Sequence, residues 1–381
     1  MEAGQTENYA LPAWQGDFSR HVAGWRWLLR NVLAPFAYTR LLLLFAGWFA
    51  LTWLPGARAD GWNHPTSYSA INMWSHCDSR WYLSIARDGY QLTPNEQSNI
   101  AFAPLYAMLM RVGGWIGGGS DPAFLIAGII IANIALIAAV AYLIALMQME
   151  GYDESTAARA GWYLLVFPTS FFFSAAYPMS LFIALAIGAF YAARRDQWRI
   201  AGMLVGLATL SRPDGVMLCA GLAVEYWQQH RFSLKHGVLW LASGPAAVIG
   251  WMAFQWYRFG DPLAFVHIQK TWGSYTLHDL LQSNSGRLQF AGPVLFAVLL
   301  VMAIRHLRPG YIFYAAAMLA VMLAAPRYCS ITRYIIVLFP VYMMLAIAAR
   351  RWRWVHLAFT APSLLVSMLL MIRFTLCLWV A

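Results

Sequence analysis

Long apolar runs, several of them long enough to cross a membrane, constrain this chain more than any other feature. Mean hydropathy is +0.54 over 381 residues, and 61% of the residues are hydrophobic while 11% are charged. Inside hydrocarbon, backbone N–H and C=O groups must be paired within the protein, which leaves helices or closed barrels. The runs lack the two-residue alternation of barrel strands. The sequence therefore predicts an all-α polytopic membrane protein with one domain over 1–381.

Proline, glycine and charged residues divide the apolar sequence into about eleven predicted spans. They lie near 36–54, 122–148, 157–176, 179–193, 199–212, 214–228, 237–257, 288–304, 310–325, 331–349 and 355–375. The spans 179–193, 199–212 and 214–228 are short for a hydrocarbon layer about 30 Å thick. Such spans fit local thinning, or helices that stop part-way at a cavity.

Basic residues mark one side of the membrane. They cluster in four connections: Arg194, Arg195 and Arg199; Arg231 and Lys235; Arg305 and Arg308; Arg350, Arg351 and Arg353. The positive-inside rule makes these connections and the stretch 1–35 cytoplasmic. The basic connections all fall on the cytoplasmic side only if the segment 101–117 does not cross the membrane completely. We therefore expect 101–117 to be re-entrant or interfacial, within a first outer loop over 55–120. We interpret the net charge of +10 as this topology signal and not as nucleic-acid binding.

Four cysteines have no spacing typical of a metal site, and nothing in the sequence requires a metal or another cofactor. A Cys77–Cys329 bridge across the outer face is left open. No cleavable signal peptide is evident, and the apolar run from Leu41 is expected to be an uncleaved first span.

The segment 74–91, WSHCDSRWYLSIARDGYQ, concentrates ionisable residues in a chain that is otherwise largely hydrocarbon. Charges kept near a membrane core are costly and usually mark a functional site. Asp78 is the principal candidate, with His76 and Arg80 beside it. If Asp78 begins a helix, Tyr82 follows it on the same face. A simple N-cap role for Asp78 remains an equal alternative.

Two arginines, Arg212 in SRPDG and Arg333 in ITRY, stand at the predicted outer ends of apolar spans. A guanidinium can hold phosphate oxygens through two parallel hydrogen bonds. Asp214, Arg327 and Tyr334 are close by in sequence, which favours an anionic ligand. The alternative for each arginine is a side chain that only reaches toward the interface.

A third segment, GDPLAFVHIQKTWG (260–273), begins with a turn signal at Asp261. An amphipathic interfacial helix is expected to place Gln269 and Trp272 on one side, with Lys270 beside them. The predicted outer tip 167–178 carries aromatic residues typical of a membrane belt, which can also grip an isoprenoid chain or stack on a sugar: Phe171, Phe172, Phe173 and Tyr177.

Six segments together resemble a known family. They are CDSRWYLSIARDGY (77–90), AFAPLYAML (101–109), FPTSFFFSAAYPMSLFIALAIGAFYAAR (167–194), AGMLVGLATLSRPDG (201–215), GDPLAFVHIQKTWG (260–273) and TRYIIVLFPVYMMLA (332–346). The chain is similar to the PIG-V-like family, the second mannosyltransferase of glycosylphosphatidylinositol anchor assembly, and to its bacterial relatives. The resemblance implies a GT-C bundle with an active-site cavity on the outer face. It also implies a bacterial inner membrane protein whose active site faces the periplasm.

The resemblance further implies transfer of a hexose, mannose first, from a polyprenyl-phosphate donor to a lipid, glycan or protein acceptor, with inversion. Asp78 matches the family's essential aspartate and would act as the base, while Arg212, Arg333 and Arg327 would bind the donor phosphate. Substrate-binding candidates are His76, Arg80, Tyr82, Tyr177, Asp214, Asp261, Gln269, Lys270, Trp272 and Tyr334. Two departures are Cys77, where an aromatic residue is common, and Met179, where relatives often carry an acidic residue.

Other functions fit some of the same residues. A polyprenyl-phosphate carrier or flippase, or a small-molecule transporter, would use the arginines to bind phosphate in transit. Transporters often show paired internal repeats. The break at SRPDG has no matching half, which favours the enzyme. An oligosaccharide ligase would share the acidic base and the arginines.

Overall fold

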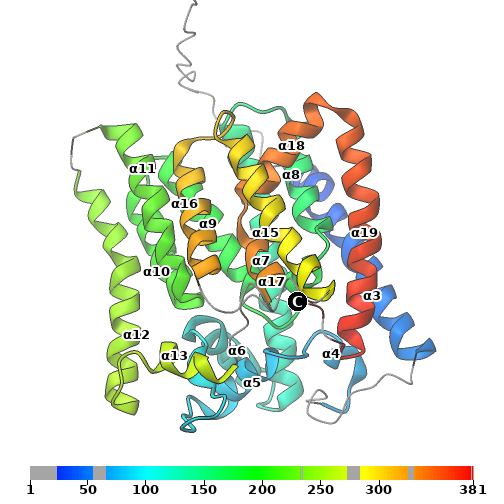
Figure 1. Ribbon diagram of the computed structural model, residues 1–381, viewed down its shortest axis with the longest axis vertical. Coiled ribbons are helices and arrows are strands. Elements are labelled where there is room, and N and C mark those ends of the chain that lie inside the picture. The colour runs from blue at the N-terminus through cyan, green and yellow to red at the C-terminus, as the bar shows by residue number, and fades with distance from the viewer. Residues whose placement is uncertain are drawn as a thin grey trace, which may run out of the picture.

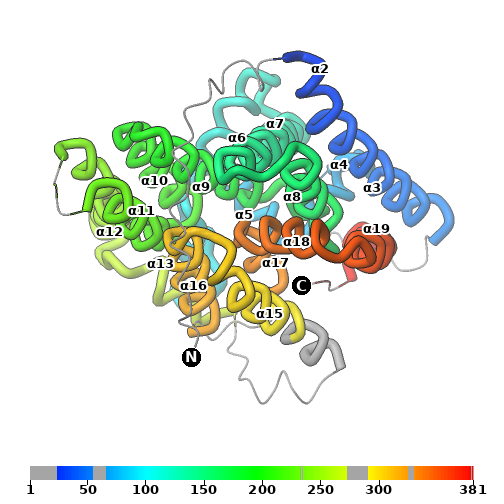
Figure 2. The backbone as a smooth tube through the Cα atoms, turned by 90° about the horizontal axis from the view of Figure 1, so that it is seen from above, coloured from blue at the N-terminus to red at the C-terminus, as the bar shows by residue number. Residues whose placement is uncertain are grey.

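The structure, a computed structural model, describes residues 24–54, 66–231, 233, 235–272, 284–324, 330–378 and 380. Every regular element within these ranges is helical. The longer helices run side by side, while the short helices α4, α5, α6 and α13 gather at one end of the bundle (Figure 1). Viewed from above, α3 and α19 lie together at one side and α10, α11 and α12 at the other (Figure 2).

Each predicted apolar run corresponds to helical structure. The long helices are α3 (Ala34–Trp53), α7 (Asp121–Met149), α8 (Glu154–Val166), α9 (Met179–Arg194), α10 (Trp198–Ser211), α11 (Leu218–His230), α12 (Ser243–Phe259), α15 (Asn284–Ala303), α16 (Pro309–Ala324), α18 (Pro340–Arg351) and α19 (Arg353–Thr375). The shorter helices are α2 (Trp25–Leu28), α4 (Ser69–Asn72), α5 (Ser79–Asp88), α6 (Pro104–Ile116), α13 (Ala264–His267) and α17 (Ile331–Tyr334). The 3₁₀ turns that concern the site are η5 (Ser170–Phe173), η6 (Pro213–Met217), η8 (Ile268–Trp272) and η10 (Ile335–Val337).

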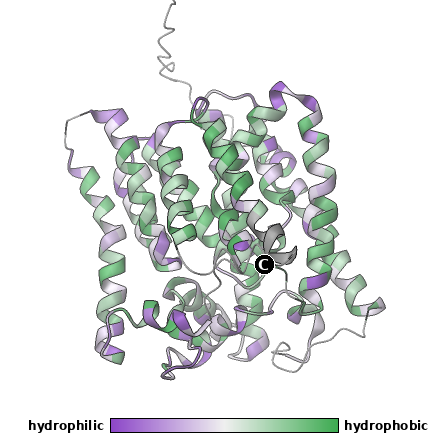
Figure 3. Cartoon of the chain, in the orientation of Figure 1, coloured by the Kyte–Doolittle hydropathy of each residue, from purple (hydrophilic) through white to green (hydrophobic). Residues whose placement is uncertain are grey.

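Four helical stretches in the described residues are long and apolar enough to span a membrane. They are Trp25–Trp53, Asp121–Met149, His236–Phe259 and Arg353–Thr375. A bent pair, Ile331–Val337 with Pro340–Arg351 at 74°, would make a fifth. Hydrophobic residues predominate in the middle of the bundle, and hydrophilic residues gather toward its two ends (Figure 3). The chain is therefore an integral membrane protein, and the number of spans, about eleven, stays a prediction.

One predicted span is wrong in its second half, because 157–176 is not a continuous helix. Helix α8 ends at Val166, and the 3₁₀ turn η5 follows it. Phe167 adopts an extended conformation (φ −53°, ψ 142°), as expected for a residue that precedes a proline. The break turns the segment 167–178 into a folded loop inside the bundle, where Phe171, Phe172 and Tyr177 are almost fully buried.

An arginine inside the first span supports this loop. Arg40 on α3 is 6% exposed, and its guanidinium donates to the carbonyl oxygens of Leu165 (2.7 Å) and Ser170 (3.1 Å). It also donates to the hydroxyl of Ser174 at 3.0 Å. Carbonyl groups released where a helix ends need new partners when they are buried. Arg40 supplies them, and so fixes η5.

At the opposite end of the bundle, buried ion pairs join several helices. The carboxylate of Glu225 on α11 is fully buried and lies 3.0 Å from Arg308 and 3.5 Å from Arg194. Arg194 also pairs with Glu150 at 2.8 Å, and Glu150 accepts a 2.7 Å hydrogen bond from Tyr311 on α16. This network connects α7, α9, α11 and α16 at the basic end.

Candidate active site

Asp78 lies at the start of α5, as its sequence context predicts, but it does not cap the helix. Its side chain accepts no hydrogen bond from the first turn. The backbone of the preceding loop is fixed instead by Tyr177, whose hydroxyl accepts from the Asp78 N–H (3.2 Å) and donates to the His76 carbonyl (3.0 Å). Cys77 between them has a positive φ of 54°. The carboxylate of Asp78 is therefore directed toward another element.

That element is α17, from which Arg333 contacts Asp78. Arg333 Nη2 lies 2.7 Å from Asp78 Oδ2, and the same nitrogen donates to Tyr334 Oη at 3.0 Å. The arginine side chain is 6% exposed, whereas that of Asp78 is 23% exposed. The carboxylate is thus the more accessible member of the pair. The two residues are far apart in the sequence and meet only because the bundle folds.

Aromatic rings surround the Arg333 guanidinium. Its carbon atom lies 5.6 Å from the ring centre of Phe172, 5.2 Å from that of Tyr177 and 5.0 Å from that of Tyr334. Cations are stabilised over aromatic faces at such distances, and more strongly when they are shielded from water. Phe172 and Tyr177 both belong to the loop that Arg40 supports, so α3 positions the site indirectly.

Arg212 ends α10 beside this cluster. Its Nε and Nη2 atoms bind the two oxygens of Asp214 at 3.1 and 2.6 Å, and its Nη1 contacts Met179 Sδ at 3.0 Å. The guanidinium lies 5.2 Å from the ring centre of Tyr334, which also faces Arg333. The two predicted phosphate-binding arginines therefore share one aromatic ring, and each already holds a carboxylate.

A wall of aromatic residues extends from Asp78 along α5. Tyr82, one turn after Asp78, is buried and meets Phe102 and Tyr106 edge to face. Burial raises the pKa of the Tyr82 phenol, and the charge of Asp78 raises it further, so this hydroxyl stays protonated. Trp81 stacks on Phe102, and Trp272 of η8 meets Trp81 at 5.8 Å. Trp272 thereby joins the predicted third segment to α5.

Other predicted site residues lie apart from the ion pair. The His76 ring is buried against Phe374, with Cys377 Sγ at 3.2 Å from Nδ1, and its binding of substrate stays a prediction. Asp261 lies 2.7 Å from His267, which holds the pKa of the Asp261 carboxyl below its usual value.

Gln269 and Lys270 belong to η8, and Arg80 is a half-buried residue on α5. No contact of Asp261, Gln269 or Lys270 with Asp78, Arg333 or Arg212 occurs within the described ranges. Arg327 and Cys329 lie outside the described residues, as does the proposed Cys77–Cys329 bridge. Over the part of the chain that the structure describes, no three His, Cys, Asp or Glu side chains gather as a metal site would need.

Comparison with known proteins shows which family part of this sequence resembles. Residues 63–235, somewhat less than half of the chain, match the family model described as "Mannosyltransferase (PIG-V)". The match includes Asp78, Tyr177, Arg212 and Asp214. Over these residues the chain is similar to this mannosyltransferase family. No curated protein sequence matches it significantly.

Three solved structures are similar to this chain to different extents. ArnT from Cupriavidus metallidurans bound to undecaprenyl phosphate has a TM-score of 0.51 at 16% identity, over 90% of this chain and 76% of that one. The same ArnT in the apo state gives 0.49 at 17% identity, over 78% and 70%. The oligosaccharyltransferase AglB from Archaeoglobus fulgidus, in complex with an inhibitory peptide and a dolichol-phosphate, gives 0.40 at 12%, over 89% and 55%. The first of these similarities shows that the chain shares the fold of ArnT.

Sequence reasoning missed one contributor to this site, Arg40, and one contact of another, Phe172. The sequence carried a signal for Arg40, because a cation within an apolar run usually has a functional or structural role. Phe172 was noted as part of the aromatic tip, but its contact with Arg333 had no signal in the sequence, because that contact depends on the turn that replaces the second half of the predicted span.

Proposed function

We propose that this protein transfers a hexose, with mannose as the first candidate, from a polyprenyl-phosphate donor to an acceptor hydroxyl. Asp78 is the general base, and the anomeric carbon is inverted. The observation that carries the proposal is the 2.7 Å contact between Asp78 and Arg333, which puts a partly accessible carboxylate beside a buried cation. The match to a mannosyltransferase family supports the sugar. The similarity in fold to ArnT bound to undecaprenyl phosphate supports the class of donor.

The reaction is a single displacement. The acceptor oxygen bonds to the anomeric carbon while the bond from that carbon to the donor phosphate oxygen breaks. The electron pair leaves with polyprenyl phosphate, and the hydroxyl proton moves to Asp78. A positioned general base typically contributes about 10²–10⁴-fold to rate. The leaving group is already a phosphate, so an ordinary carboxylate suffices.

Two guanidiniums stabilise the phosphate as its charge grows. In this structure each is bound to a carboxylate, and the donor phosphate replaces Asp78 on Arg333. Arg333 Nε has no hydrogen-bond partner within the described residues and is available as a further donor. Arg212 directs Nη1 at the sulfur of Met179, a weak acceptor. Preorganised cations of this kind usually provide a large share of catalysis.

The site faces the non-cytoplasmic side, which in a bacterium is the periplasm. The basic residues that include Arg195 and Arg199 follow the end of α9 opposite to the end near Asp78. Short interfacial helices, α5 and α6, form the outer wall. The acceptor is a lipid, a glycan or a protein that reaches this face.

The proposal is tested by comparing Asp78→Asn with Asp88→Asn, an exposed aspartate on the same helix that pairs with Arg87. Protein in liposomes receives polyprenyl-phosphate mannose and a membrane extract as acceptor, and mass spectrometry follows mannose transfer. Asp78→Asn should lower the rate by about 10²-fold or more because the base is lost. The Asp78→Asn variant should still bind the donor, and the Asp88→Asn variant should remain active. Full activity in Asp78→Asn would remove Asp78 from the mechanism, and phosphate binding without transfer in the native protein would favour a carrier.

A further inference from the structure

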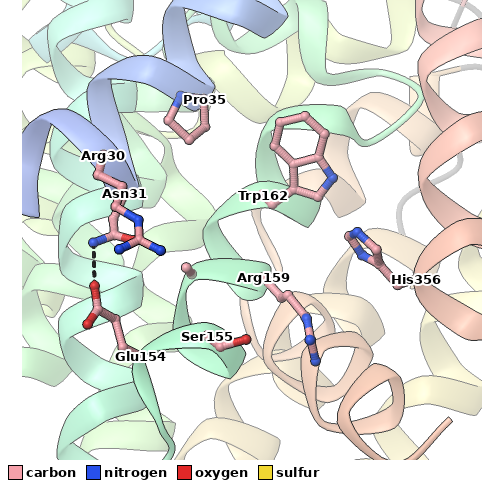
Figure 4. A pocket seen from close by; sticks show the side chains of 9 residues that line it. Arg30, Asn31, Pro35, Glu154, Ser155, Arg159, Trp162 and His356 are labelled. Carbon is pink, nitrogen blue, oxygen red and sulfur yellow. Dashed lines mark hydrogen bonds between the residues drawn. The ribbon is translucent and has the colours of Figure 1, made fainter. Parts of the chain in front are cut away.

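A cavity whose lining does not include Asp78 lies at the first turn of α8. It is an open cavity of about 450 Å³ between the start of α3, the start of α8 and α19. Its wall includes Arg30, Asn31, Glu154, Arg159, Trp162 and His356 (Figure 4). The loop that carries Phe172 follows the other end of α8, about 18 Å away along a 13-residue helix. The cavity is therefore separate from the candidate active site.

Two guanidinium groups in this wall have no polar partner among the described residues. Across the described residues, neither Arg30 nor Arg159 takes part in a hydrogen bond or an ion pair. The single carboxylate of the wall, Glu154, accepts a 2.8 Å hydrogen bond from Asn31 (Figure 4). The wall of the cavity therefore carries two cations without a partner in the described residues and one carboxylate that is already hydrogen-bonded. This excess of positive charge favours an anionic ligand.

The remaining polar groups of the wall are used internally. His356 Nδ1 lies 3.0 Å from Tyr163 Oη, and Trp162 Nε1 donates to Thr360 at 3.2 Å. These hydrogen bonds join α8 to α19 beside the cavity. Arg159, half-buried on α8, and Arg30, exposed on η1 (Leu29–Leu33), approach the hollow from two different elements (Figure 4).

The surface below the cavity is apolar and faces outward. Tyr38 and Leu41 on α3 are 53% and 63% exposed, and Leu357 on α19 is 72% exposed. Both helices belong to stretches apolar enough to cross the membrane. A ligand whose charged end enters the cavity can therefore lay hydrocarbon chains along α3 and α19. This combination of features fits a lipid better than a free anion.

We propose that this cavity binds the headgroup phosphate of an anionic phospholipid in the leaflet at the basic end of the bundle. Arg30 and Arg159 hold the phosphate oxygens, since guanidiniums bind phosphate through paired hydrogen bonds. Basic pockets between membrane helices on the cytoplasmic side are suited to such headgroups. The bound lipid links α3, α8 and α19, and the site is independent of the sugar-transfer reaction.

The test uses the purified full chain in detergent and native mass spectrometry with phosphatidylglycerol or phosphatidylcholine of identical acyl chains. The variant Arg30→Gln/Arg159→Gln is compared with Arg195→Gln/Arg199→Gln, which removes the same charge from the connection after α9. The native protein and the control should retain phosphatidylglycerol over phosphatidylcholine. The pocket variant should retain at least fivefold less phosphatidylglycerol.

Ala158→Phe provides a second variant, which fills the cavity and keeps both arginines. It should also lose phosphatidylglycerol, and this result stands even if the double arginine variant fails to fold. Equal phosphatidylglycerol binding by the native protein and by whichever pocket variants fold would overturn the proposal, as would equal binding of the two lipids. A third arm adds inorganic phosphate. Displacement of the lipid by millimolar phosphate would identify a site for soluble anions and would contradict the proposal that the cavity binds a lipid.

Discussion

At the scale of single residues, the site depends on how Arg333 is held. The guanidinium contacts the Asp78 carboxylate and the Tyr334 hydroxyl through one nitrogen and lies over three aromatic rings. A lysine at this position keeps the charge but loses the planar fork and most of the ring contact. Charge alone is therefore a poor substitute, and the geometry of the cation should matter for binding the donor.

Arg333→Lys should raise the donor KM about tenfold, since two parallel hydrogen bonds to phosphate become one. Initial rates at varied donor concentration measure the effect. Arg87→Lys on the exposed face of α5 is the matched control, because Arg87 pairs with Asp88 and Asp121 away from the site. An unchanged KM in Arg333→Lys would mean that this arginine only supports the fold.

At the scale of helices, the two ends of the bundle are built differently. The end near Asp78 is made of short helices and turns packed through aromatic rings, as with Trp81, Phe102 and Trp272. The other end is tied by Glu225, Arg194 and Arg308 in a buried network. The ion-pair network therefore stabilises the end opposite to Asp78, and aromatic packing stabilises the end at which we propose that substrates bind.

Glu225→Ala should lower the free energy of unfolding by about 1.5–3 kcal/mol, because it leaves Arg308 without its carboxylate and takes one of two carboxylates from Arg194. Gln228→Ala, an exposed residue on the same helix, serves as the control and should change stability little. Thermal unfolding of the two variants in one detergent makes the comparison. Equal midpoints would show that the network contributes nothing to holding α9, α11 and α16 together.

At the scale of the whole molecule, the sequence predicted the class of fold and the meeting of distant segments. Apolar runs report helices directly, since hydrocarbon allows few alternatives. The break after Val166 was missed because Pro168 stands in an otherwise apolar run, and only tertiary contacts from Arg40 make the turn stable. Asp78 and Arg333 were predicted to share one site, but their direct ion pair was not predicted, because N-capping and ion pairing look identical in sequence.

The orientation of the whole molecule gives a separate prediction. Cysteine placed at Asp88, in a Cys77→Ser background, should react with a membrane-impermeant maleimide in intact cells. Cysteine at Arg199 should react only after permeabilisation, because the basic end is cytoplasmic by the positive-inside rule. Both positions are exposed. The reverse pattern would place the Asp78 site in the cytoplasm and end the proposal of an outward-facing donor site.

The central claim is that Asp78 and Arg333 act as one catalytic unit. A double-mutant cycle of Asp78→Asn and Arg333→Gln, read out as the rate of sugar transfer from polyprenyl-phosphate mannose, measures it most directly. The account predicts strong non-additivity, with the double variant about as slow as the worse single variant. Purely additive losses would contradict it, because the two side chains would then contribute independently despite their contact.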